Sequence, residues 1–190
     1  MNSSAGIGDP YFYEWTVGLE SVVSLLTPET NLISVILQST TAGSLDDIVC
    51  EYIDNITYIQ VKHTRKNRKL GFGFIINSEK NTDSLLKKIA KSWKELRQRS
   101  SKPAIAVLLT NMELVNTTSF INRFGEKINT PSLLEFWNWF SGNVVNFESI
   151  ADFEKSARKE WLPIVKAIVE EADVFEGEEE LLAFLRSFTI

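Results

Sequence analysis

The spacing of hydrophobic residues changes from a helical to a strand pattern in the first part of the chain. From Tyr11 onward apolar residues recur every three or four positions, which predicts an amphipathic helix. Asp9 suits the N-cap, Pro10 suits the first helical position and Pro28 marks the end. The apolar stripe of this helix is Tyr11, Trp15, Leu19, Val22 and Leu26.

Three short segments rich in β-branched and aromatic residues follow the helix. Residues 32–38 form an apolar run, and residues 48–53 and 56–61 flank the turn signal Asp54-Asn55. The last two segments are therefore expected to form a β-hairpin. With the helix, the three strands predict an α-β-β-β opening.

The predicted hairpin brings three polar side chains together. Side chains alternate between the two faces of a strand, so Asp47, Val49 and Glu51 share one face of the first strand. Gln60 and Lys62 share one face of the second strand. A carboxylate, an amide oxygen and an ammonium group can thus converge at one place.

The middle of the chain is expected to complete a sheet. Residues 72–76 are interpreted as an extended segment, and Asn81 or Thr82 then caps a helix that reaches about Arg99. The seven residues after Pro103 are interpreted as a buried central strand, joined to the hairpin by a right-handed crossover. The apolar stripe of the helix is Leu85, Leu86, Ile89, Trp93 and Leu96.

The remainder is expected to be mostly helical. Tyr11, Phe12, Trp15, Trp137 and Trp139 are candidates for base stacking, but aromatic residues at helical spacing usually belong to a core. The whole pattern predicts an α/β fold, with a mixed central sheet flanked by helices and an α-helical C-terminal elaboration. The later helices are predicted at residues 130–142, from residue 149 with an interruption at Pro163, and at residues 178–188.

Composition narrows the class of protein. At 190 residues, 44% of them hydrophobic and 24% charged, the chain predicts one soluble domain. It contains no apolar run of about 18 residues, and its polar opening lacks the apolar centre of a signal peptide, so a cytoplasmic location without membrane contact is expected. Its abrupt end also suggests that a longer protein continues from it. With Cys50 and His63 as the single cysteine and histidine, metal binding must use oxygen ligands, which favours Mg²⁺ or Mn²⁺ over Zn²⁺.

Charge is unevenly distributed along the chain. Residues 62–102 hold thirteen Lys or Arg against three acids, a local charge of +10 within a chain of net charge −5. Lys87, Lys91 and Lys94 lie on one face of the predicted helix. Such a stripe is usually a solvated face, but its position after Lys62 favours a surface that faces DNA.

The polar residues of the hairpin resemble a known nuclease motif. Asp47 followed one strand later by Gln60-Val61-Lys62 is similar to the PD-(D/E)xK nuclease superfamily, in the QxK version of Mrr-like enzymes. The wording DPYFYEWTVGL, ILQSTTAGSLDDIV and YIQVKHT resembles more closely the N-terminal double-stranded-DNA endonuclease domain of bacterial anti-phage effectors, such as CBASS proteins with a SAVED sensor. The specific part of the resemblance covers roughly residues 9 to 64.

The resemblance implies a restriction-endonuclease-like core and assigns the site residues. Asp47, Gln60, Val61 and Glu14 would bind one or two Mg²⁺ or Mn²⁺ ions, and Lys62 would orient the attacking water. Asp46 is the alternative to Asp47, and Glu20 is the alternative to Glu14. His63 points to the opposite face and lacks a His or Cys partner, so it is not expected to bind metal.

The implied activity is hydrolysis of double-stranded DNA with little sequence specificity. The resemblance also implies a role in antiviral defence, a sensor or ATPase domain fused or in trans, and a homo-oligomer as the active form. A catalytically degenerate DNA-binding or assembly module, an RNA nuclease and a purely structural module remain alternatives. The expected DNA-binding residues are Arg65, Lys66, Arg68, Lys69, Lys87, Lys91 and Lys94.

Overall fold

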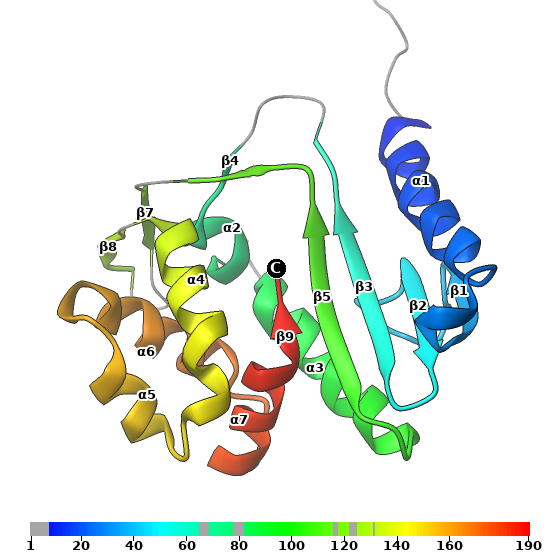
Figure 1. Ribbon diagram of the computed structural model, residues 1–190. Helices are drawn as coiled ribbons and strands as arrows, with labels where there is room; N and C mark the ends of the chain where they lie inside the picture. Colours follow the sequence, from blue (N-terminus) through cyan, green and yellow to red (C-terminus); the bar gives the residue numbers. More distant parts are fainter. Residues whose placement is uncertain (1–7, 65–68, 78–81, 116–117, 122–124, 131) are drawn as a thin grey trace, which may run out of the picture.

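The protein has a mixed α/β structure, built on a central sheet with helices packed against it (Figure 1). The computed structural model describes residues 8–64, 69–77, 82–115, 118–121, 125–130 and 132–190. The five sheet strands lie in the order β1-β2-β3-β5-β9, with antiparallel pairing from β1 to β3 and parallel pairing from β3 to β9. Their bounds are β1 Leu32–Leu37, β2 Ile48–Tyr52, β3 Ile56–Lys62, β5 Ala104–Thr110 and β9 Phe188–Thr189.

The predicted hairpin is confirmed, but its turn lies at Ile53-Asp54 and not at Asp54-Asn55, because Tyr52 N donates to Asn55 O at 2.9 Å. Strands β2 and β3 pair in the register Val49 opposite Tyr58 and Cys50 opposite Thr57. The first of these pairs faces the large hydrophobic core under α3, whereas Cys50 faces a smaller core under α1. The sheet is therefore buried on both faces near the hairpin, which explains the density of β-branched residues in it.

The first helix, α1 (Gly8–Ser24), begins one residue before the predicted cap Asp9, ends four residues before Pro28, and turns the opposite face inward. Tyr13 and Val17 pack on the sheet, and Gly18 approaches it so closely that an added Cβ would stand 2.7 Å from Leu37. A glycine at the contact lets the helix backbone lie on the strand, so its face becomes the buried one. The residues expected to form the buried stripe are exposed, together with Phe12: these are Tyr11, Trp15, Leu19, Val22 and Leu26.

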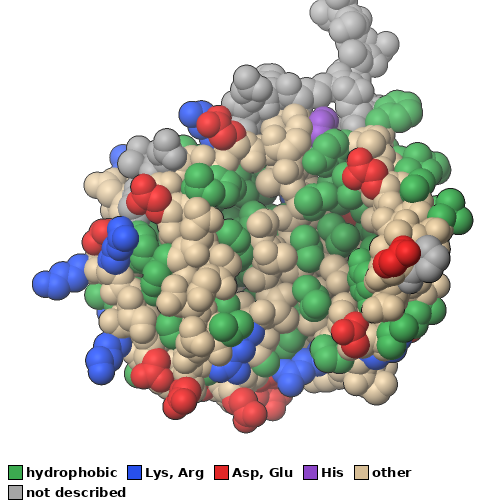
Figure 2. Space-filling model, in the orientation of Figure 1, with side chains coloured by type: hydrophobic (Ala, Val, Ile, Leu, Met, Phe, Trp, Pro, Cys, Tyr) green, Lys and Arg blue, Asp and Glu red, His purple; other side chains and the backbone are tan. Residues whose placement is uncertain are grey.

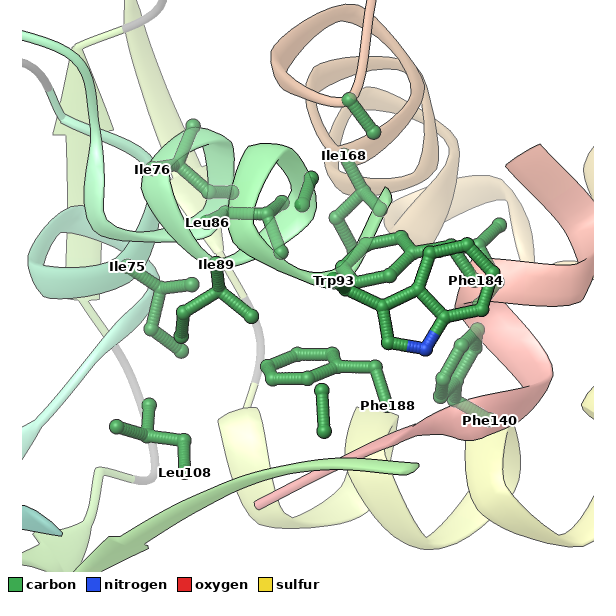
Figure 3. Packing of buried hydrophobic residues seen from close by; sticks show 14 of the residues in the cluster. Ile75, Ile76, Leu86, Ile89, Trp93, Leu108, Phe140, Ile168, Phe184 and Phe188 are labelled. Atoms are coloured by element: carbon green, nitrogen blue, oxygen red, sulfur yellow. The ribbon is translucent and has the colours of Figure 1, made fainter. Parts of the chain in front are cut away.

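The second predicted helix, α3 (Leu85–Arg99), packs on the other face of the sheet. Its cap is Ser84 and not Asn81 or Thr82: the Ser84 hydroxyl accepts a hydrogen bond from Lys87 N at 3.1 Å, and residue 81 lies outside the described residues. Trp93 fills the centre of the core and donates its Nε1 hydrogen to the Ala104 carbonyl at 2.8 Å (Figure 3). The buried stripe was correctly predicted, with Leu85 partly buried beside it.

The prediction of an extended segment at residues 72–76 was wrong. This segment is the short helix α2 (Phe72–Ile76), which buries Phe72, Ile75 and Ile76. Those positions are three and four residues apart, the spacing of one helical face, and the preceding Gly71 starts the turn. Burial on that face outweighed the strand propensity of the isoleucines.

The C-terminal part is largely helical, with two departures from the prediction. Short strands occur before it, and the end of the last predicted helix leaves the helix to pair with β5 as strand β9. Pro131, predicted at a helix start, lies outside the described residues, and the cap there is Ser132. The predicted interruption of the helix that starts after Ser149 does occur: it lies between Ser156 and Leu162, and Pro163 stands in the first turn of the next helix. The elements are β4 Lys69–Leu70, β6 Glu113–Leu114, β7 Thr118–Ile121, β8 Lys127–Thr130, α4 Leu133–Asn143, α5 Ile150–Ser156, α6 Leu162–Glu171 and α7 Glu178–Ser187, with 3-10 turns at Pro28–Thr30, Val144–Asn146 and Lys159–Trp161.

The C-terminal helices pack through aromatic side chains. Phe136, Phe153 and Trp161 are almost fully buried, and Trp139 stacks on Phe153 with ring centroids 5.9 Å apart. Trp137 is also buried, so both tryptophans of α4 belong to the core, as their spacing indicated. In the described ranges no helix combines the length and the apolar character that crossing a membrane requires.

Candidate functional site

The hairpin and α1 bring the candidate catalytic residues to one end of the sheet (Figure 1). Asp47 immediately precedes β2, and Gln60 and Lys62 stand at the end of the antiparallel neighbour β3. The Asp47 Oδ2 atom accepts hydrogen bonds from the Val61 backbone N–H at 2.6 Å and from the Gln60 side-chain amide. Gln60 is only 6% exposed, so this contact is held inside the protein.

Two carboxylates share this place, and the pKa of each is raised above its ordinary value. Burial raises the pKa of Glu14 above its ordinary value, and the like charge of Asp47 raises it further. Burial also raises the pKa of Asp47, against the opposing effects of the Val61 N–H and the charge of Lys62. Two half-buried acids whose ionised forms are disfavoured form a place that a cation would stabilise.

Lys62 lies beside both acids. Its charge lowers the pKa of Glu14 and of Asp47, which places it within electrostatic reach of each. Its backbone pairs with Thr110 of β5, so the residue is anchored between two strands. Across the described ranges the Lys62 ammonium group has no ion pair within 4 Å, and it is free to meet a bound anion.

The donor chemistry of the site fits a hard divalent cation. Asp47 and Glu14 supply carboxylate oxygens, and a half-turn of the Gln60 amide would present Oε1 in place of the nitrogen that now faces Asp47. The carbonyl of Val61 leaves the strand on the same side as its N–H, which points at Asp47. The described residues contain no group of three or more His, Cys, Asp or Glu arranged around one point, so any cation here depends on the amide and the backbone as well as on two acids.

The structure also separates the alternatives for the acidic residues. The charge of Asp46 raises the pKa of both Glu14 and Asp47, so this residue is near the site, and its backbone carbonyl accepts a bond from Ser39 N at 2.7 Å. Glu20 is exposed, whereas Glu14 is half-buried and lies within electrostatic reach of Asp47 and Lys62. Of the two candidates on α1, Glu14 is therefore the one that meets the hairpin.

Glu51, on the same strand face as Asp47, does not join the site. Its carboxylate binds the Lys102 ammonium group at 2.7 Å and the Ser34 hydroxyl at 3.3 Å, and these contacts lower its pKa. It stands at the opposite end of β2 from Asp47. The shared face therefore carries one carboxylate of the site and one that belongs to a structural ion pair.

Two residues support the site although sequence analysis assigned them no role in it. The His63 ring stacks on Tyr13 with centroids 4.7 Å apart, which ties the end of β3 to α1 next to Glu14. Asn111 accepts a bond from Thr64 N and donates one to Thr64 O, both at 3.0 Å. His63 directly follows the predicted site residue Lys62, and Asn111 directly follows the end of β5. This adjacency in the sequence is the signal that could have identified both residues.

The basic residues predicted to face DNA divide into two groups. Arg65, Lys66 and Arg68 lie outside the described residues, and Lys69 is exposed, 4.0 Å from a Glu113 carboxylate oxygen. The three lysines of α3 have their charges matched by acids within the chain. Their ion pairs are Lys87 with Asp173 at 2.7 Å, Lys91 with Asp83 at 2.5 Å, and Lys94 with Glu176 at 3.2 Å and Glu180 at 3.6 Å.

These ion pairs lead to a prediction about the salt dependence of DNA binding. Each phosphate contact contributes about one unit to the log-log slope of affinity against salt. Because Lys87, Lys91 and Lys94 are paired with acids, replacing all three by Gln should leave that slope unchanged, measured by fluorescence anisotropy on a duplex. Replacing Lys69 and its neighbours at residues 65–68 by Gln should flatten it by several units, and the reverse pattern would assign the contact to α3.

The raised pKa of Asp47 leads to a second prediction. Its folded state holds a proton at pH values above 3.8, the ordinary pKa, where the unfolded chain has already released it. Folding stability therefore falls as pH rises through the folded pKa, and at neutral pH the ionised Asp47 destabilises the metal-free protein. Asp47→Asn keeps the acceptor for Val61 N–H and should raise the melting temperature at about pH 7 in EDTA.

The matched control for that measurement is Glu148→Gln, which removes one negative charge at an exposed position. It should leave the melting temperature nearly unchanged. The gain from Asp47→Asn should disappear at about pH 3.5, where the native carboxyl is already protonated. A gain of the same size at both pH values would show that the pKa of Asp47 is not its cause.

No known protein-family model matches this chain, and no curated protein sequence matches it.

Proposed function

We propose that the protein is a metal-dependent nuclease that hydrolyses phosphodiester bonds of double-stranded DNA. The observation that carries the proposal is the convergence of Asp47, Gln60, Lys62 and Glu14 at one end of the β2–β3 hairpin. The resemblance of the hairpin to the QxK form of the PD-(D/E)xK motif supports it, as does the mixed sheet with helices against it. A restriction-endonuclease-like core belongs to this same proposal.

Some residues of the site would bind the metal ion, and Lys62 would contact the water and the phosphate. Asp47, Glu14, the Gln60 amide oxygen and the Val61 carbonyl would hold Mg²⁺ or Mn²⁺. When bound, such an ion supplies Lewis-acid activation of a water molecule and neutralises charge on the phosphate.

Lys62 places its ammonium group beside the carboxylates, where it can donate hydrogen bonds to the attacking water and to a phosphate oxygen. Asp47, whose Oδ2 already accepts two hydrogen bonds, keeps β2 and β3 in register at this point. The chain thus supplies a cationic group and a pair of acids at the place where the phosphate would bind.

The biological setting is proposed on the resemblance. Cleavage with little sequence specificity, a part in antiviral defence, a cytoplasmic location and control by a sensor or ATPase domain form one consistent account. A nuclease that cuts any duplex must be restrained in its own cell, so activity that depends on assembly is expected.

The experiment that tests the proposal compares substrates and metals side by side. Purified protein with Mg²⁺ or Mn²⁺ should nick and then degrade supercoiled plasmid, and EDTA should stop the reaction. Duplex RNA of equal length should remain intact under the same conditions. Degradation of RNA in preference to DNA would show that the protein is an RNA nuclease. Binding of DNA without cleavage at any protein concentration would show that it is a catalytically degenerate DNA-binding module.

A further inference from the structure

The edge of the molecule formed by α1 and β1 exposes hydrophobic side chains on both faces of the sheet: those of α1 on one face, and Ile36, which lies beside Val49, on the other. We call it the apolar edge and define it by Phe12, Trp15, Leu19, Leu26, Ile33 and Ile36, each more than half exposed. Figure 2 shows hydrophobic side chains gathered on the side of the molecule where α1 lies. Soluble monomers rarely expose contiguous apolar patches of more than a few hundred Å².

The edge strand beneath this helix has one protective irregularity, a β-bulge between Leu32 and Ser34, and pairs regularly with β2 from Ser34 to Leu37. Among the strands that the structure describes, β1 pairs with β2 on one side and has no neighbour on the other. Its sequence, LISVIL, holds no Lys, Pro or acid, the residues by which natural edge strands discourage pairing with another chain. A helix face and a strand edge that both lack a partner thus lie side by side.

A two-fold symmetry axis perpendicular to the sheet would relate two copies of the chain so that both the helix face and the strand edge gain a partner. Paired strands lie about 4.8 Å apart and packed helices about 8–10 Å apart, so β1 would stand about 2.4 Å from the axis and α1 about 5 Å. The underside of α1 contacts β1 at Leu37 and β2 at Cys50, so the helix does lie over the space between these strands. A second copy of the chain can therefore pair its β1 with β1 of the first copy and pack its α1 against α1 of the first copy at the same time.

The distribution of charge favours a second copy of the chain over a membrane or a nucleic acid as the partner of the apolar edge. The chain has no Lys or Arg before Lys62, and α1 and the turn after it carry the exposed acids Glu20 and Glu29, so neither an anionic membrane nor nucleic acid is attracted to this surface. The residues of the apolar edge are themselves uncharged, so they can face their own copies without like charges meeting. Six such side chains expose on the order of 800 Å², close to the roughly 800 Å² per partner of a stable interface.

We infer that the apolar edge is the contact surface of a symmetric homodimer, in which β1 pairs antiparallel with β1 of the second copy and α1 packs against its counterpart. Phe12, Trp15, Leu19 and Val22 of α1 recur at intervals of three, four and three, the spacing by which paired helices interlock. The inference does not depend on the proposed nuclease activity, because it uses no residue of that site.

The test is the mass of the protein in solution, measured by light scattering during gel filtration. At concentrations on the order of tens of micromolar the chain should elute at twice its 21.6 kDa mass. Trp15→Glu and Ile36→Lys should each weaken the dimer by about 30-fold or more, the effect of removing a central contact of an interface. Val145→Glu, a charge placed at an exposed apolar position elsewhere, should leave the dimer intact.

Two further readouts keep the inference falsifiable. Circular dichroism should show the same fold in every variant, and amide hydrogen exchange of β1 should be slow in the parent and fast in Trp15→Glu. Added salt should preserve or tighten the dimer, because its contact is apolar and the net charges repel. A monomeric parent protein would overturn the inference, and so would a dimer that both substitutions leave intact. If the monomer floats with phosphatidylcholine vesicles, the apolar edge binds lipid and the dimer inference is equally overturned.

Discussion

Lys62→Ala should lower the rate of plasmid cleavage by about 10²–10³-fold while leaving Mn²⁺ affinity nearly unchanged. The reason is that Lys62 contributes a positive charge beside Asp47 and Glu14 but is not expected to bind the cation. Asp47→Ala should abolish both cleavage and Mn²⁺ binding, because it removes an oxygen ligand and the acceptor of two hydrogen bonds. Cleavage is followed by gel electrophoresis and Mn²⁺ affinity by calorimetry.

The matched control is Lys88→Ala, which removes an exposed lysine of α3 far along the chain from the hairpin. It should cut at the parent rate. Lys62→Arg keeps the charge but replaces a compact ammonium group by a planar guanidinium, so partial activity is expected. Lys62→Ala protein that cuts as fast as the parent would exclude the proposed mechanism.

Trp93→Ala should destabilise the protein by about 3–5 kcal/mol, the usual cost of removing a large buried aromatic side chain. Trp93 is 2% exposed, and its ring meets Phe175 at 5.8 Å and Phe184 at 5.5 Å between centroids. The substitution removes these contacts and leaves the Ala104 carbonyl without its donor. For a chain of this size the melting temperature should fall by roughly 10–15 °C.

Two variants separate packing from hydrogen bonding in that result. Trp93→Phe retains most of the ring contacts and loses the hydrogen bond, so a cost of about 1–2 kcal/mol is expected. Phe74→Ala removes an aromatic side chain of α2 that is 43% exposed and should cost less than about 1 kcal/mol. Equal losses for Trp93→Ala and Phe74→Ala, measured by urea unfolding, would contradict the assignment of Trp93 to the centre of the core.

The parts of the fold that sequence analysis predicted are those where two signals agree. The β2–β3 hairpin combines a turn signal with a run of β-branched residues on each side, and it forms with its turn at Ile53-Asp54, one residue before the predicted Asp54-Asn55. The difference moves the pairing by two residues, which keeps each side chain on its predicted face, so the grouping of Asp47 with Gln60 was predictable. For α3 the apolar stripe was unambiguous because its other face is strongly charged.

The parts that could not be predicted are those where the local sequence is equally compatible with two structures and tertiary packing determines which one forms. Helix α1 is apolar on two faces, and periodicity alone cannot show that the side holding Gly18 lies against Leu37. The segment Phe72–Ile76 suits a strand or a helical turn equally until its burial is known. Strand β9 has two residues and exists only because β5 offers it an edge.

The side-chain partners of the charged residues depend on the same long-range packing. The sequence places Lys87 and Lys94 on one face of a helix but cannot show that Asp173 and Glu176, some eighty residues later, lie against that face. The sequence therefore locates positive charge without showing how much of it is already compensated. The same limit applies to Glu51, which was grouped with Asp47 by strand alternation and is bound instead to Lys102.

The measurement that tests the central claim most directly is the location of bound Mn²⁺ by paramagnetic broadening in NMR spectra of isotope-labelled protein. The account predicts that amide signals of Asp47 and Ile48 on one strand, and of Val61 and Lys62 on the other, broaden first, and that Mg²⁺ competes with this effect. Asp47→Asn should remove the broadening without changing the rest of the spectrum. Broadening centred on another acidic region, such as residues 170–180, or spread evenly over the surface, would contradict the assignment of this end of the hairpin as the metal site.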